Sequence, residues 1–189
     1  GSTSNHHLAT LVGLLLATYE MNAFRDAYQA RVRANAKAFA RSLRAQGIEV
    51  EGDERDGFTE THQVLIRVKK HGSGQAIARR LEDNNIVTNY QALPDDETFL
   101  ESSGVRLGVQ EMTRFGMTEK DFDVLAGYLA DVIIRNRNVK DEVARYRLGF
   151  LEMAYCLPPA EAVPLAAGIL KSVFPRPGLI EGLAENLLK

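Results

Sequence analysis

The segment 103–108, with the sequence Ser-Gly-Val-Arg-Leu-Gly, places Arg106 between two glycines. If the valine and leucine beside the arginine mark a strand, alternation puts them on one face and Arg106 on the other. Gly104 and Gly108 share the face of Arg106 and have no side chain to crowd it. A planar guanidinium can bind a carboxylate through two parallel hydrogen bonds. The segment therefore indicates an anion-binding arginine, with a strand arginine that faces water as the equally weighted alternative.

The composition indicates a folded domain without a polyanion-binding surface. Of the 189 residues 45% are hydrophobic, which supports a real core. The formal net charge of -2 argues against general binding to nucleic acid or to an anionic membrane. The longest apolar run, about Leu8 to Tyr19, is too short to span a bilayer and lacks the flanks of a secretory signal. Cys156 is the only cysteine, so a reducing cytoplasm is expected, with this side chain buried or half-buried.

Hydrophobic spacing predicts an α+β module with helices at both ends. The chain is expected to open with two long helices, one to about Glu20 and one from about Ala23 to Gln46 that Gly47 closes. A small sheet and its helices follow, and the proline-rich last thirty or so residues predict one or two short appended helices. The expected strands are 48–51, 63–68, 86–90 and 105–109, and the expected helices are 73–83, a segment beginning at Thr118 with Asp121, and 139–155.

No complete catalytic signature accompanies the arginine. The glycines of Gly72-Ser73-Gly74 predict a turn rather than a phosphate-binding loop. The histidines lack the spacing of metal ligands, so no metal site is predicted, and no nucleophile elbow is present. Asp95-Asp96-Glu97 is an acidic loop that we expect to be solvated. Taken alone, the sequence predicts a carboxylate clamp without a reactive group.

The segment around Arg106 resembles part of a known family once its neighbours are included. Residues 103–108 followed by Thr113-Arg114-Phe115-Gly116 resemble the Ser-Gly-x-Arg-x-Gly … Thr-x-Arg-Gly segment of serine hydroxymethyltransferases. Three other stretches are similar to that family in the same order and spacing, and the set covers about residues 1–157. They are 4–8, similar to the end of a Pro-Gly … His segment, 61–65, similar to Asn-His-Leu-x-Leu, and 84–96, similar to Gly-Ile-Thr-Val-Asn-x-Asn-x-x-Pro-x-Asp.

The resemblance implies the small C-terminal domain of a fold-type I pyridoxal-phosphate enzyme, with long leading helices, a small mixed or antiparallel sheet and C-terminal helices. It implies interdomain helices over 1–47, the small domain over 48–157 and an appended helical tail over 158–189. No lysine lies in a segment like the family's Thr-His-Lys, so the large domain that carries the cofactor lysine is expected to be absent. No catalytic residue is therefore assigned, and the chain alone is predicted to be inactive.

The resemblance also implies roles for individual positions. Arg106 matches the arginine that holds the α-carboxylate of the substrate and so orients it on the cofactor ring. Ser2 and Thr3 fall where the family has Gly-Gly, whose backbone approaches the cofactor phosphate of the neighbouring subunit. Gln91 falls at an asparagine that touches folate. Because the family's Gly-Thr-Pro is replaced by Gly108-Val109-Gln110, amino-acid binding is better supported than folate use.

The function implied is that of a transferase of one-carbon metabolism that makes or breaks the Cα–Cβ bond of β-hydroxy amino acids, as in serine/glycine interconversion. Pyridoxal 5'-phosphate is the implied cofactor, bound mainly by the missing large domain, and tetrahydrofolate remains open. A cytoplasmic homodimer that binds an amino acid, and neither nucleic acid nor a membrane, is expected. Two alternatives stay open: a folate-independent threonine-type aldolase or transaldolase, and a noncatalytic dimerisation or binding module.

Overall fold

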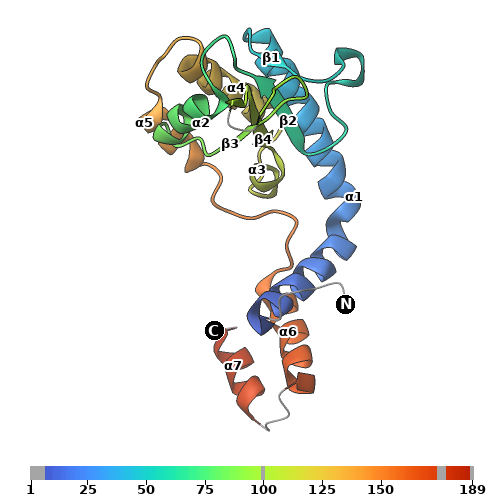
Figure 1. Cartoon of the computed structure of the whole chain (residues 1–189). Coiled ribbons are helices and arrows are strands. Elements are labelled where there is room, and N and C mark those ends of the chain that lie inside the picture. Colours follow the sequence, from blue (N-terminus) through green and yellow to red (C-terminus); the bar gives the residue numbers. More distant parts are fainter. Residues whose placement is uncertain (1–6, 99–100, 174–177, 188–189) are drawn as a thin grey trace. The chain divides into compact units, whose positions relative to one another are not determined.

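The computed structural model describes residues 7–98, 101–173 and 178–187. These residues form two compact units (Figure 1). One unit consists of the described parts of 1–26 and 155–189, and the other is Ala27–Ala154. The domain boundaries expected from the sequence stay a prediction.

The first helix, α1 (Leu8–Ala45), is a single helix of 38 residues that contributes to both units. The prediction of two helices meeting near residues 21–22 was wrong, because Met21-Asn22 contains no glycine or proline that would end a helix. Within the second unit α1 buries a stripe that includes Val32, Phe39 and Leu43. Gly47 follows the helix at φ +90°, a conformation that favours glycine, as the sequence indicated.

Four antiparallel strands form one sheet in the order β1-β2-β4-β3. They are β1 (Glu49–Val50), β2 (Gln63–Arg67), β3 (Asn89–Gln91) and β4 (Gly104–Gly108). All four expected strands are present, although β3 begins at Asn89 rather than at Ile86. On one side of β4, Arg106 lies opposite Leu65 of β2, and on the other side it lies opposite Asn89 of β3.

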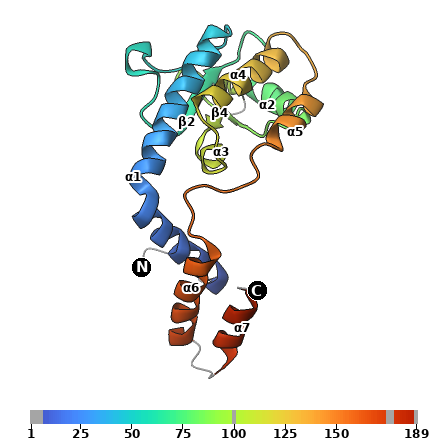
Figure 2. The same cartoon turned by 180° about the vertical axis from the view of Figure 1, so that it is seen from behind.

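Helices α1 and α4 (Glu119–Ile133) lie on one side of this sheet, as the two opposite views show (Figures 1 and 2). The same unit contains α2 (Gly74–Asp83), α3 (Gln110–Arg114) and α5 (Lys140–Arg147), and a short 3-10 turn spans Glu54–Asp56. The core lies between α1, α4 and the sheet, where Val105 and Leu107 are at most 4% exposed. The ring centroids of Phe39 on α1 and Phe122 on α4 are 5.2 Å apart. The α+β class is therefore confirmed.

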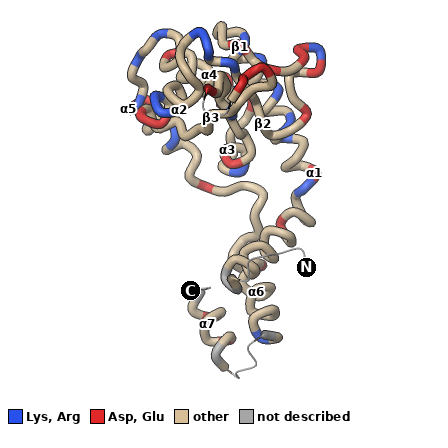
Figure 3. Tube along the Cα trace, viewed as in Figure 1, with Lys and Arg blue, Asp and Glu red and all other residues tan. Residues whose placement is uncertain are grey.

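Helix starts were easier to predict than helix ends. Ser73 caps α2 by accepting a hydrogen bond from the Ala76 amide at 3.2 Å, and Thr118 with Asp121 forms the capping box of α4. The helix expected over 139–155 ends at Arg147, and the short α3 was not predicted. Along the Cα trace of the same unit, acidic and basic residues are interspersed rather than segregated (Figure 3).

The other unit contains α6 (Pro159–Val173) and α7 (Leu179–Leu187), which confirms the predicted appended helices. The Leu157 amide donates a hydrogen bond to Glu20 at 3.2 Å, which ties the segment before α6 to α1. Cys156 is half-buried, as expected from the sequence. Among the described residues, no helix is both long enough and apolar enough to cross a membrane.

Candidate functional site

Arg106 lies on the sheet face that α1 and α4 do not cover. Because directly opposed residues share a face, Arg106 and Asn89 form part of one row across the strands. The adjacent row on the same face contains Gln91 on β3, Gly104 on β4 and Arg67 on β2. Two residues along a strand span about 7 Å, so the two rows are about one arginine side chain apart. The structure therefore brings Arg106, Gln91 and Arg67 together on one face.

Arg106 is half-buried, and its side chain forms no hydrogen bond or ion pair with any of the residues that the structure describes. A partly desolvated charge is costly unless it is paired. Its neighbours in the row, Asn89 and Leu65, are neutral. An arginine in this setting is available to an anion from outside, and its fork suits a carboxylate.

The two glycines that flank Arg106 allow close packing rather than leaving empty space. A Cβ atom at Gly104 would lie 2.8 Å from the side chain of Leu93, and one at Gly108 would lie 2.7 Å from Oε1 of Gln110. The prediction of cleared space on both sides of Arg106 was therefore wrong. The side chain of Leu93 packs against Gly104 instead, and the amide of Gln110 lies beside Gly108. The sequence pattern gave no signal for either contact.

Of the other predicted site residues, Gln91 lies one row from Arg106 on the same face. Its side-chain Nε2 donates a hydrogen bond to the Ala92 carbonyl at 3.3 Å. Its role as a folate contact stays a prediction. Ser2 and Thr3 lie outside the described residues.

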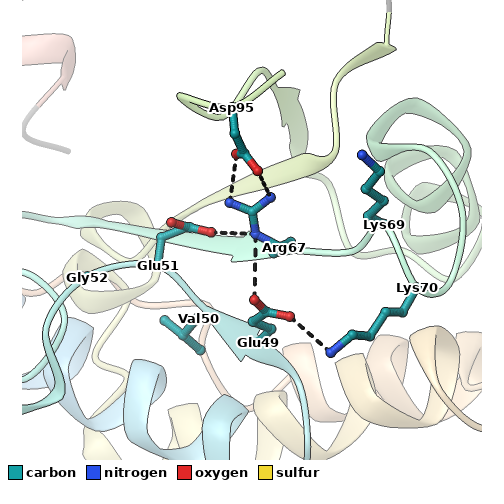
Figure 4. Close-up of a pocket in the computed structure, with 8 residues that line it drawn as sticks. All are labelled: Glu49, Val50, Glu51, Gly52, Arg67, Lys69, Lys70 and Asp95. Atoms are coloured by element: carbon teal, nitrogen blue, oxygen red, sulfur yellow. Dashed lines mark hydrogen bonds and ion pairs between the residues drawn. The ribbon is translucent and has the colours of Figure 1, made fainter. Parts of the chain in front are cut away.

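A pocket of about 600 Å³ surrounds Arg67 at the same face (Figure 4). Nη1 and Nη2 of Arg67 each donate a hydrogen bond to Asp95 at 2.8 Å, and Nε donates to Glu51 at 2.9 Å. Glu49 approaches Nε at 3.6 Å and is itself 3.3 Å from Nζ of Lys70. The pocket is lined by Glu49, Val50, Glu51, Gly52, Arg67, Lys69, Lys70 and Asp95.

These ion pairs fix the charge states of the cluster. The hydrogen bonds to Asp95 are the main reason that the pKa of Arg67 is raised, and they likewise lower the pKa of Asp95. The sequence analysis did not identify this cluster. The available signal was the alternation of β2, which places Arg67 on the face away from Val64 and Ile66.

The acidic loop after β3 has a structural role that was not predicted. Oδ2 of Asp96 accepts hydrogen bonds from the amides of Leu93 and Ser103, both at 2.8 Å, which closes the loop between β3 and β4. These hydrogen bonds lower the pKa of Asp96 to about 2. Asp95 and Glu97 are exposed, as expected, and Asp96 is half-buried; the hydrogen bonds that Asp95 and Asp96 also accept within the fold were not predicted.

The sequence of the chain was compared with those of known proteins. A family model described as serine hydroxymethyltransferase matches residues 1–129. The chain is 43% identical over 155 residues to a serine hydroxymethyltransferase of Pyrobaculum aerophilum, with 81% of this chain and 36% of the relative covered. The chain belongs to the serine hydroxymethyltransferase family. The recognition made from the segment around Arg106 is thus confirmed.

Other relatives agree with this assignment. A serine hydroxymethyltransferase of Staphylothermus marinus is 42% identical over 157 residues, covering 80% of this chain and 36% of the relative. The structure is similar to that of an L-threonine transaldolase from Pseudomonas fluorescens, with a TM-score of 0.70 and 33% identity over 82% of this chain and 36% of the other. This serine hydroxymethyltransferase-family chain therefore spans about a third of the length of the relatives it matches.

The described residues of this family member suit an amino-acid carboxylate better than a pyridoxal-phosphate cofactor. The cofactor needs a lysine amine in a protected site. The two lysines in the Arg67 pocket, Lys69 and Lys70, are exposed, and Lys70 pairs with Glu49. No group of His, Cys, Asp and Glu within the described ranges is placed to hold a metal ion. What this face offers to a carboxylate ligand is Arg106, which has no ion-pair partner among the described residues.

Proposed function

We propose that this chain is the C-terminal part of a pyridoxal-phosphate-dependent enzyme that interconverts serine and glycine by making or breaking a Cα–Cβ bond. The membership in the serine hydroxymethyltransferase family supports the reaction class. The observation that carries the chain's own role is the half-buried Arg106 without a partner among the described residues. The intact enzyme is proposed to be a cytoplasmic homodimer.

In this proposal Arg106 binds the α-carboxylate of the amino-acid substrate. Two parallel hydrogen bonds fix both the position and the rotation of the carboxylate. Such a fixed orientation aligns the bond to be broken with the group that accepts its electrons, which is the role of the cofactor when it is bound. Leu93 packs against Gly104 and the side-chain amide of Gln110 lies beside Gly108, the two residues that flank Arg106 on its face of the strand.

An enzyme assembled from this chain and the N-terminal part of the Pyrobaculum aerophilum relative tests the proposal. Serine cleavage with and without tetrahydrofolate is measured for the parent and for Arg106→Ala. Two charge-assisted hydrogen bonds are worth about 3–6 kcal/mol together, so kcat/KM should fall about 10²- to 10⁴-fold. Arg79→Ala, at an exposed position on α2, serves as the control. An unchanged kcat/KM for Arg106→Ala contradicts the assigned role.

The similarity to a threonine transaldolase makes a folate-independent aldolase or transaldolase the second candidate. Gln91 in place of the family's asparagine favours it, since glutamine keeps the amide but adds a methylene group. The same assembled enzyme separates the two: a serine cleavage rate that tetrahydrofolate does not change, with cleavage of threonine, supports the transaldolase or aldolase. An assembly that binds its partner chain but cleaves neither amino acid supports a noncatalytic module.

A further inference from the structure

Another pocket, of about 530 Å³, is lined by residues of α1, α3, α4 and α5, by the end of β4 and by the segment 85–88 that leads into β3. Aromatic and thioether side chains form much of its wall: Phe39, Met112, Met117, Phe122, Tyr128 and Tyr146. Pockets of about 300–1,000 Å³ with mainly apolar linings are typical sites for small organic molecules. Since an apolar cavity of about 150 Å³ already accepts benzene, this pocket has room for an aromatic ring.

The aromatic wall of this pocket is fixed by contacts within the fold. The ring of Phe122, which is 1% exposed, packs against that of Phe39. The rings of Tyr128 and Tyr146 meet edge to face, with centroids 6.0 Å apart and an angle of 68° between their planes. The hydroxyl of Tyr146 donates a hydrogen bond to Asp121 at 2.8 Å, and Asp121 also caps α4. A ligand would therefore meet rings that are already ordered, which lowers the entropy cost of binding.

Thr88 provides a buried polar atom in this lining. It directly precedes β3, and alternation places its side chain on the face of Tyr90, which lies opposite the buried Val105. That face packs toward the helices, in agreement with the position of Thr88 in the pocket wall. The Oγ1 atom of Thr88 is buried and has no hydrogen-bond partner among the residues that the structure describes. A buried hydroxyl without a partner is unfavourable, so a ligand that offers a hydrogen-bonding group gains affinity there.

The charged groups of the lining, Glu111 and Arg147, favour a neutral ligand, because their opposite signs give the pocket no net charge. Glu111 is exposed, whereas Cζ of Arg147 lies 4.6 Å from the centroid of the Phe115 ring and its guanidinium donates a hydrogen bond to the Phe150 carbonyl. We propose that the pocket binds a small neutral aromatic molecule, with Oγ1 of Thr88 as its hydrogen-bond partner. The site goes beyond the proposed function, since neither serine nor glycine carries an aromatic ring.

The competing explanation is a loosely packed region between α4 and α5 in which Thr88 serves only the fold. Phenol and toluene separate the two explanations, because the molecules are alike in size and differ by a hydroxyl and a methyl group. The dissociation constants of both are measured by NMR through the amides of α4, for the parent and for Thr88→Val. The difference in hydration between the ligands cancels when the two proteins are compared. We expect Thr88→Val to weaken phenol relative to toluene about threefold to tenfold.

An unchanged ratio of the two dissociation constants in Thr88→Val overturns the proposal, and so does the absence of phenol binding to the parent. Thr98→Val, at an exposed position outside the pocket lining, is the matched control and should change neither constant. Thr88→Ser keeps the hydroxyl and should keep the preference for phenol. If Thr88→Val does not fold, Thr88→Ala compared with Thr88→Ser gives the same test.

A second variant locates the binding site. Ala144 is an exposed residue of α5 in the pocket lining, so the indole added by Ala144→Trp should obstruct the pocket. Both phenol and toluene should then bind more weakly than to the parent. Binding that Ala144→Trp leaves unchanged lies elsewhere on the chain and also overturns the proposal.

Discussion

Gly104 is the position where a single methyl group should have the largest effect near Arg106. A Cβ atom there would lie 2.8 Å from the Gln91 carbonyl oxygen and 2.8 Å from two carbons of Leu93. Ordinary contacts begin near 3.4 Å, so β3 or the loop after it must move by several tenths of an ångström. Such overpacking costs about 1–3 kcal/mol. For a unit of this size about 4 °C is lost per kcal/mol, so Gly104→Ala should lower Tm by about 4–12 °C.

Gly127→Ala is the matched control for this substitution. Gly127 lies inside α4, and a Cβ atom there would meet nothing within 4 Å. Alanine is favoured over glycine in a helix interior by about 0.5–1 kcal/mol, so Tm should rise by about 2–4 °C. Melting is followed by far-ultraviolet circular dichroism, and amide exchange in β4 assigns the transition to this unit. Equal melting temperatures for the two alanine variants would refute the packing argument.

Two further predictions concern pH. Because the folded pKa of Asp96 is lowered to about 2, its stabilisation is present above about pH 4 and lost as the pH falls toward 2; Asp96→Asn should remove this part of the acid sensitivity in pH-dependent unfolding. Burial and the 2.8 Å hydrogen bond to Asp121 raise the pKa of Tyr146, so its stabilisation is present below about pH 10 and is lost above it. Tyr146→Phe should lose that alkaline dependence, which alkaline unfolding curves of both proteins would reveal.

Local periodicity predicted the strand that carries Arg106, because alternation along β4 depends only on adjacent residues. It also predicted the starts of α2 and α4, since a cap and its partner lie within one helical turn. The same reasoning placed a break in α1 where none exists. Leu8–Tyr19 and the later stripe with Phe39 differ in composition, but no residue between them ends a helix. A change in the apolar face alone does not interrupt the backbone.

The cluster around Arg67 could not be predicted in the same way. Its members come from β1, β2 and the loop after β3, so their contact depends on strand order and register rather than on spacing. The contact between Leu93 and Gly104, two residues before Arg106 on β4, likewise depends on tertiary structure. Leu93 packs against Gly104 from a loop in which the Leu93 amide donates a hydrogen bond to Asp96. Sequence pattern identified the cation of the site, whereas tertiary structure determines its surroundings.

The two arginines on the open face of the sheet differ in the charge of their neighbours. Glu49 lies opposite Arg67 in the β1–β2 register, and Glu51 and Asp95 complete its carboxylate partners. Asn89, which lies opposite Arg106, is neutral. Since an arginine cannot lose its proton in this setting, only the supply of nearby carboxylates decides whether it is occupied. The carboxylates at this face are bound by Arg67 and Lys70, and Arg106 has no carboxylate partner among the described residues.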